Sequence, residues 1–123
     1  MTIYISGPIT GIPDRNKKMF QMAQSEIAFL CKGIKREKVK IINPVKLGLK
    51  LDEVFARNGK EPTWEDYMRA CIKELCGATY LLSMTNWANS EGATLERYIA
   101  KRLNIPIAEN IKELSELITG GLK

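Results

Sequence analysis

The sequence predicts an α/β fold in which a parallel β-sheet carries helices on both faces. Short apolar runs that end at Gly, Pro or Asn alternate along the chain with longer segments of helical periodicity, and this alternation is typical of parallel sheets. The chain has 123 residues, 45% of them hydrophobic, which is enough for one compact core and too little for two. We therefore expect a single domain over residues 1–123.

The first half of the chain predicts two strands and one clear helix. The run TIYISG predicts a strand at residues 3–6, which a Gly-Pro pair ends. Apolar residues then recur at helical spacing over residues 14–31, with Asp14 or Asn16 as the N-cap and Gly33 as the stop. A second strand is expected at residues 39–42. For the stretch from residue 45 to 62 we expect a short helical turn and a long polar connection, which is often a lid or a binding loop.

The second half repeats the alternation. Thr63 is expected to cap a helix of about three turns, with Asp66 placed as in a capping box. The remaining elements are a buried strand at 78–84, a helix at 90–103 that Ser90 caps, a short strand at 105–108 and a closing helix near 111–118.

In a parallel sheet of this kind, ligands bind beyond the carboxyl ends of the strands, where the strand order reverses. The loops there hold our candidate binding residues: Ser6, Gly7, Pro8, Ile9, Thr10 and Gly11 after the first strand, Asn43 after the second, and Trp87, Ser90 and Gly92 after the third. Gly7 and Gly11 would let the backbone approach a ligand closely, although a tight turn explains them equally well. The chain contains neither a dinucleotide fingerprint nor a phosphate-binding P-loop.

Composition excludes several chemistries. The chain has no histidine, which excludes Ser-His-Asp and Cys-His nucleophile activation and histidine-ligated zinc. Its net charge is +5, which would suit a phosphorylated small molecule or a polyanion. The densest basic run, residues 32–40, carries no aromatic residues for base stacking. A solvated turn is therefore favoured over a nucleic-acid patch.

Cysteine content and the N-terminus indicate the compartment. Three cysteines at Cys31, Cys71 and Cys76 fit no common disulfide or metal framework, so we expect reduced and mostly buried thiols, and neither a metal nor a cofactor. The chain opens without the pattern of a secretion signal, and no apolar run reaches the about 18 residues that a membrane span requires. We expect a cytoplasmic protein.

Glu96 is the residue that demands an explanation. On a helical wheel at about 100° per residue, it falls inside the apolar arc of the helix that Ser90 begins. That arc also holds Gly92, Ala93, Leu95, Ile99, Ala100 and Leu103. A carboxylate there must be paired, protonated or catalytic, because an unpaired buried charge is expensive. Two interpretations follow: a structural ion pair with an arginine or lysine, or a carboxylate nucleophile.

Several segments together resemble the nucleoside 2-deoxyribosyltransferase-like superfamily, and most closely a small branch of it found in phages and bacteria. The segments are TIYISGPITG, NP, WEDYMRACIKEL, YLLSMTNWANSEGATLE and IAKRLNIPI, which span residues 2 to 107. The most specific part is Ser-x-Gly-x-x-x-Glu, formed by Ser90, Gly92 and Glu96.

The resemblance implies a flavodoxin-like three-layer sandwich with a four- to five-stranded parallel sheet. It also implies an enzyme that cleaves or transfers the N-glycosidic bond of a deoxynucleoside or deoxynucleotide without a cofactor. Glu96 would be the nucleophile with Tyr4 beside it, the backbone of Gly7 to Gly11 would line the sugar or its 5′ group, and Ser90 would receive a hydroxyl or phosphate. Relatives form dimers or larger assemblies, so a homo-oligomer is expected.

This sequence departs from the superfamily pattern at three positions. The aspartate that usually assists the leaving base or orients the sugar aligns with Cys71, and the usual acidic residue at the start of the third strand aligns with Thr79. The phosphate-binding arginine of the nucleotide-hydrolysing relatives aligns with Thr10. Asp66 lies over a turn before Cys71 and is not expected to replace the aspartate. For Trp87, stacking on a nucleobase and structural packing are equally open, and Trp64 is expected to pack.

Three functions are therefore in view. The first is an N-glycosidic enzyme with Glu96 as its nucleophile. The second is a nucleotide-binding protein of the same fold with weak or no catalysis. The third, a nucleic-acid-binding accessory protein, rests on positive charge alone.

Overall fold

A four-stranded parallel sheet organises the protein, whose computed structural model describes residues 1–34 and 38–120. Its strands are β1 (Thr2–Ser6), β2 (Lys40–Ile42), β3 (Tyr80–Ser83) and β4 (Ile107–Ala108), and they lie in the order β2-β1-β3-β4. All three pairings are parallel. The chain therefore has the predicted α/β architecture, and the strand order reverses between β1 and β3, where ligand sites form in open parallel sheets.

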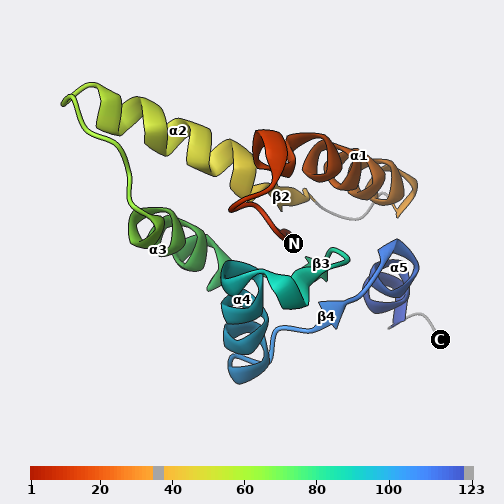
Figure 1. Cartoon of the computed structure of the whole chain (residues 1–123). Helices are drawn as coiled ribbons and strands as arrows, with labels where there is room; N and C mark the ends of the chain where they lie inside the picture. The colour runs from red at the N-terminus through yellow and green to blue at the C-terminus, as the bar shows by residue number, and fades with distance from the viewer. Residues whose placement is uncertain (35–37, 121–123) are drawn as a thin grey trace.

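Each face of the sheet packs against its own helices, because successive side chains of a strand point to opposite faces. Ile3 and Ile5 belong to one core cluster, with residues of α1 (Lys17–Ile34) and α5 (Ile111–Thr119). Tyr4 belongs to the opposite cluster, with residues of α3 (Trp64–Leu75) and α4 (Glu91–Arg102). Figure 1 shows α1 and α5 on one side of the strands and α3 and α4 on the other.

The segment after β2 is a helix, and our expectation of a long irregular connection there is wrong. α2 spans Pro44–Ala56, with Asn43 as its N-cap and proline in its first turn. The Asn43 side chain accepts a hydrogen bond from the Val45 amide at 3.0 Å. Asn followed by Pro is a helix start as well as a strand end. The alternating leucines at 47, 49 and 51 hid the helical period, and the connection shrinks to residues 57–63.

The start of α1 also differs from the prediction. Residues Pro13–Asn16 form a 3₁₀ turn in which Asp14, Arg15 and Asn16 have φ of 53°, 54° and 58°. Asn16 is part of this turn, and its side-chain amide donates to the carbonyl of Pro8 at 3.1 Å. α1 therefore begins at Lys17, and it continues past Gly33 to Ile34.

The other local predictions hold within a few residues. The capping box of Thr63 and Asp66 is present at the start of α3, and Ser90 caps α4. The cysteines are free, but only Cys71 is buried, since Cys31 is partly exposed and Cys76 is exposed.

Two sequence features concern the surface. Part of the basic run, residues 35–37, lies outside the described residues. Among the helices of residues 1–34 and 38–120, none combines the length and apolar character needed to cross a bilayer.

Candidate functional site

Glu96 is a buried residue of α4 that lies against the carboxyl end of β1. Its residue surface is only 4% exposed. Ser6 Oγ donates a hydrogen bond to one carboxylate oxygen at 2.7 Å, and the Tyr4 hydroxyl donates to the other. Tyr4 and Ser6 are two residues apart in β1, so both side chains reach the same face of the sheet, where α4 lies. Strand periodicity thus supplies both hydroxyls.

The electrostatics of Glu96 differ from those of a surface glutamate. Burial raises its pKa from 4.5 to about 7, while the hydrogen bonds from Tyr4 and Ser6 act in the opposite direction. Ion pairs in the described part of the chain do not involve Glu96, and the adjacent Arg97 pairs with Glu109 instead. The interpretation of Glu96 as half of a structural ion pair therefore fails. Near neutral pH its carboxyl group exchanges readily between acid and carboxylate.

Two weaker acids accompany Glu96. Burial, together with the nearby Glu96 charge, raises the pKa of the Cys71 thiol to about 11. Burial and Glu96 also raise the pKa of Tyr4 well above its usual value. Both groups therefore stay protonated at neutral pH, and Glu96 is the member of this cluster that ionises first.

A cavity of about 280 Å³ opens beside this cluster. Its walls come from the loop after β1, α2, α3 and the first turns of α4. Eight of the predicted site residues line it: Gly7, Ile9, Thr10, Gly11, Cys71, Ser90, Gly92 and Glu96. Glu96 and Arg15 are the charged residues of the lining, and the remaining surface is mostly apolar. This composition is that of a small-molecule site with few polar anchors.

The other predicted residues lie elsewhere. Tyr4 and Ser6 reach the cavity only through their hydrogen bonds to Glu96. Pro8 holds Asn16 through its carbonyl, and Asn43 caps α2; neither is a lining residue. Trp87 is also outside the lining, since its ring packs on the guanidinium of Arg97.

Comparison with known proteins adds a family to this geometry. Residues 1–109 match the family model described as "Domain of unknown function (DUF4406)". The chain belongs to the DUF4406 family. Searches of curated proteins and of solved structures found no match. The DUF4406 match runs from β1 to the residue after β4, so it contains every residue that lines the cavity, whereas α5 lies beyond it.

The α3 wall of the DUF4406 cavity was missed at the sequence level. Trp64, which we expected only to pack, lines the cavity together with Tyr67 and Met68. A signal for them existed, because Trp64, Met68 and Cys71 follow one another at i, i+4 and i+7 and must share a helix face. Cys71 was already a predicted site residue, so this spacing would have placed Trp64 and Met68 beside the ligand as well.

A polar cluster at the cavity could not have been found from the sequence. Arg15 donates to Asp52 at 2.7 Å, and its guanidinium lies 5.6 Å from the centroid of the Tyr67 ring. The Tyr67 hydroxyl donates to the same carboxylate. These hydrogen bonds hold the pKa of Asp52 below its usual range despite partial burial. The cluster joins the loop after β1 to α2 and α3.

Two glycines line the DUF4406 cavity where helices approach one another. A Cβ at Gly92 would lie 3.2 Å from Met68 Sδ, which is a tight contact, whereas one at Gly48 would lie at an ordinary contact distance of 3.5 Å from the Tyr67 ring. Both positions border the cavity. Among the described residues, no group of three or more Cys, Asp or Glu side chains is arranged to hold a metal ion.

Proposed function

We propose that this DUF4406 protein cleaves the N-glycosidic bond of a deoxynucleoside or deoxynucleotide, with Glu96 as the nucleophile. The observation that carries the proposal is a buried carboxylate that lines a cavity, lacks a cationic partner and accepts hydrogen bonds from Tyr4 and Ser6. The resemblance of Ser90, Gly92 and Glu96 to the deoxyribosyltransferase-like pattern supports the same chemistry.

In the proposed reaction, ionised Glu96 attacks the anomeric carbon of the sugar. A bond forms between a carboxylate oxygen and that carbon, and the carbon–nitrogen bond breaks with its electron pair leaving on the base. Positive charge develops on the sugar in the transition state, and the adjacent carboxylate stabilises it. Water, or a second base, then attacks the same carbon and releases the glutamate. Tyr4 and Ser6 hold the carboxylate in place throughout.

The departing base must also gain a proton. Cys71 occupies the position where the resemblance expects an aspartate, and a thiol with a pKa of about 11 is a poor donor at neutral pH. The base therefore takes its proton from water. We expect turnover to be fastest for bases that leave easily, such as 7-methylguanine, which carries a positive charge before it departs.

The cavity suits a nucleoside-sized ligand. Its volume of about 280 Å³ lies just below the roughly 300–1,000 Å³ typical of ligand pockets. Trp64 and Tyr67 offer aromatic surface for a base, and the guanidinium of Arg15 offers a charged donor for a 5′-phosphate. Arg15 would thus replace the arginine that is missing at Thr10.

The test is a panel of deoxynucleosides and their monophosphates, with and without acceptor bases, analysed by chromatography. Base release or exchange should fall by several powers of ten in Glu96→Ala, and each power corresponds to about 1.4 kcal/mol of barrier. Glu91→Ala, at an exposed glutamate of the same helix, is the matched control. A 2-fluoro sugar analogue should leave an adduct on Glu96 by mass spectrometry. No release from any substrate, or equal release by the two variants, would refute the proposal.

A second candidate is a nucleotide-binding protein of the same fold with little or no turnover. Cys71 favours it, because the usual aspartate is absent. Thermal stabilisation by deoxynucleotides without base release, lost on blocking the cavity with Gly92→Leu, would support binding alone.

A further inference from the structure

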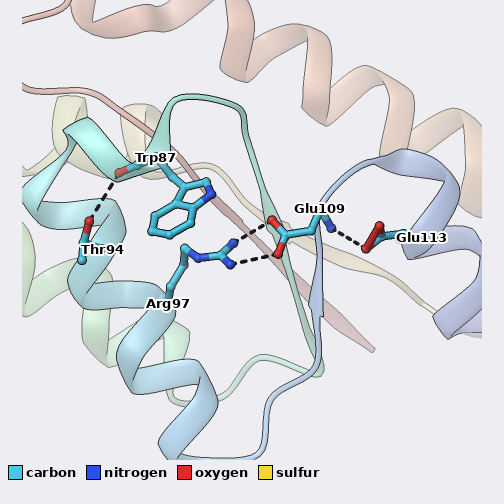
Figure 2. A network of polar contacts seen from close by, with 5 residues as sticks. All are labelled: Trp87, Thr94, Arg97, Glu109 and Glu113. Atoms are coloured by element: carbon cyan, nitrogen blue, oxygen red, sulfur yellow. Dashed lines mark hydrogen bonds and ion pairs between the residues drawn. The ribbon is translucent and has the colours of Figure 1, made fainter.

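Among the described residues, Arg97 is a buried arginine that the site above does not use. Its residue surface is 7% exposed, although it follows Glu96 directly in α4. The guanidinium donates to both oxygens of Glu109, at 2.8 and 2.9 Å. It also lies 3.9 Å from the centroid of the Trp87 ring. Figure 2 shows the guanidinium between the indole and the carboxylate.

This arrangement joins segments that are distant in the chain. Trp87 begins η2 (Trp87–Asn89), the short 3₁₀ turn after β3. Glu109 directly follows β4, and its backbone amide donates to Glu113 of α5. Arg97 therefore links α4 to the ends of two neighbouring strands, at the carboxyl edge of the sheet where the cavity lies.

Packing alone does not require a guanidinium at this place. Burying an ion pair stabilises a protein no more than well-packed apolar side chains of the same volume. Arg97 Nε is moreover buried without a hydrogen-bond partner, which adds a desolvation cost. What the guanidinium provides is geometry, because its planar fork fixes the carboxylate in two hydrogen bonds while its face fixes the indole.

Hydrogen bonds connect Trp87 to residues that line the cavity. The backbone carbonyl of Trp87 accepts a hydrogen bond from the Ser90 amide at 2.9 Å. Ser90 is the N-cap of α4, and its Oγ accepts a hydrogen bond from the Ala93 amide at 3.2 Å. Ser90 and Ala93 both line the cavity. A shift of Trp87 therefore displaces the capping serine and the helix start that face the ligand.

We infer that Arg97 is a positioning residue: through Trp87 it holds Ser90 and the first turn of α4 in the conformation that receives the ligand. It touches no reacting atom. Its effect on turnover rests on the proposed function, whereas its effect on the loop can be measured on the protein without any ligand.

Hydrogen exchange measured by mass spectrometry on the full chain provides the ligand-independent test. Arg97→Lys keeps the charge but lacks the fork and the planar face. We expect amides in peptides covering residues 85–94 to exchange roughly 10-fold faster in this variant, with peptides of β1 and α1 unchanged. Arg102→Lys, at an exposed arginine of the same helix, should match the wild type. Glu109→Gln changes the partner at a half-exposed position and should accelerate the same peptides to a lesser extent.

The kinetic test uses deoxynucleoside substrates. In Arg97→Lys, KM should rise about 10-fold with kcat within about 2-fold, because the loop sets binding while Glu96 sets the chemistry. A merely structural role would instead lower the folded fraction and leave KM unchanged.

Two exchange results would overturn the inference. One is unchanged exchange over residues 85–94 in both variants, and the other is acceleration spread evenly over β1, α1 and the loop. If the wild type turns over no substrate, the proposed function fails, and the exchange data alone still decide the role of Arg97.

Discussion

Replacing Glu96 with glutamine tests the electrostatics of the site without any ligand. The amide has nearly the shape of the carboxyl group, and the hydroxyls of Tyr4 and Ser6 can rotate to donate to its oxygen or accept from its nitrogen. The substitution therefore removes one ionisable group and leaves the packing of α4 on β1 intact.

The pH dependence follows from the direction of the shift. In the unfolded chain Glu96 has its ordinary pKa of 4.5, and in the folded protein the pKa is about 7. Between these values the unfolded chain has released the proton while the folded protein retains it, so the wild-type protein loses stability as pH rises through this window. The loss is complete above about pH 7 and amounts to roughly 3 kcal/mol, since each pKa unit corresponds to about 1.4 kcal/mol. Glu96 is almost fully buried, so solvent screening removes little of this cost.

Urea unfolding at pH 5 and at pH 8.5, followed by tryptophan fluorescence, measures the effect. Relative to the wild type, Glu96→Gln should gain roughly 3 kcal/mol of unfolding free energy between the two pH values, which corresponds to on the order of 10 °C in Tm for a domain of this size. Glu26→Gln, at an exposed glutamate of α1, is the control and should follow the wild-type profile.

A difference between Glu96→Gln and the wild type that stays constant across this pH range would refute the reasoning. The carboxyl group would then have an ordinary pKa in the folded protein. Either solvent or a cation would reach it, or the hydrogen bonds from Tyr4 and Ser6 would fully offset its burial.

Three further predictions concern the cavity and its surroundings. Arg15→Gln should raise KM for deoxynucleoside monophosphates by roughly 10-fold or more, because a charge-assisted hydrogen bond contributes about this much to binding. KM for the free nucleosides should stay nearly unchanged. Equal effects on both substrate classes would exclude a phosphate contact. Maleimide at pH 7.5 should label the exposed Cys76 before the buried Cys71 by peptide mass spectrometry, and labelling in the reverse order would show an accessible, activated thiol in the cavity. Gly7→Ala should destabilise the protein by about 1–3 kcal/mol, because its Cβ would lie 2.9–3.0 Å from Met84 atoms. Gly33→Ala has open space around it inside α1 and should stabilise the protein by roughly 0.5–1 kcal/mol. Thermal unfolding measures both effects, and a Gly7→Ala protein as stable as the wild type would contradict the close contact.

Local patterns were sufficient for most of the fold. The Ser90 and Thr63 caps, the apolar strands and the helical periods are properties of short segments, so the sequence predicts the alternation and hence the parallel sheet. The burial of Glu96 was also predictable, because it falls inside the apolar arc of its helix and that arc faces the sheet. Leu103, at the end of the same arc, is half exposed. Where two local patterns compete, as in the stretch after Asn43, the tertiary packing of α2 decided the outcome.

The sequence by itself therefore determined the fold class and one buried carboxylate, since both depend on periodicity within an element. Only the tertiary structure decided which groups surround that carboxylate. The helical wheel put Arg97 on the polar side of α4. The residue is nevertheless buried, because Trp87 after β3 and Glu109 after β4 both contact its guanidinium. Arg15 lines the cavity from a turn with left-handed backbone, and no pattern in the sequence predicted that turn. Contacts between segments far apart in the chain set the partner of each charge, and periodicity within one segment carries no information about them.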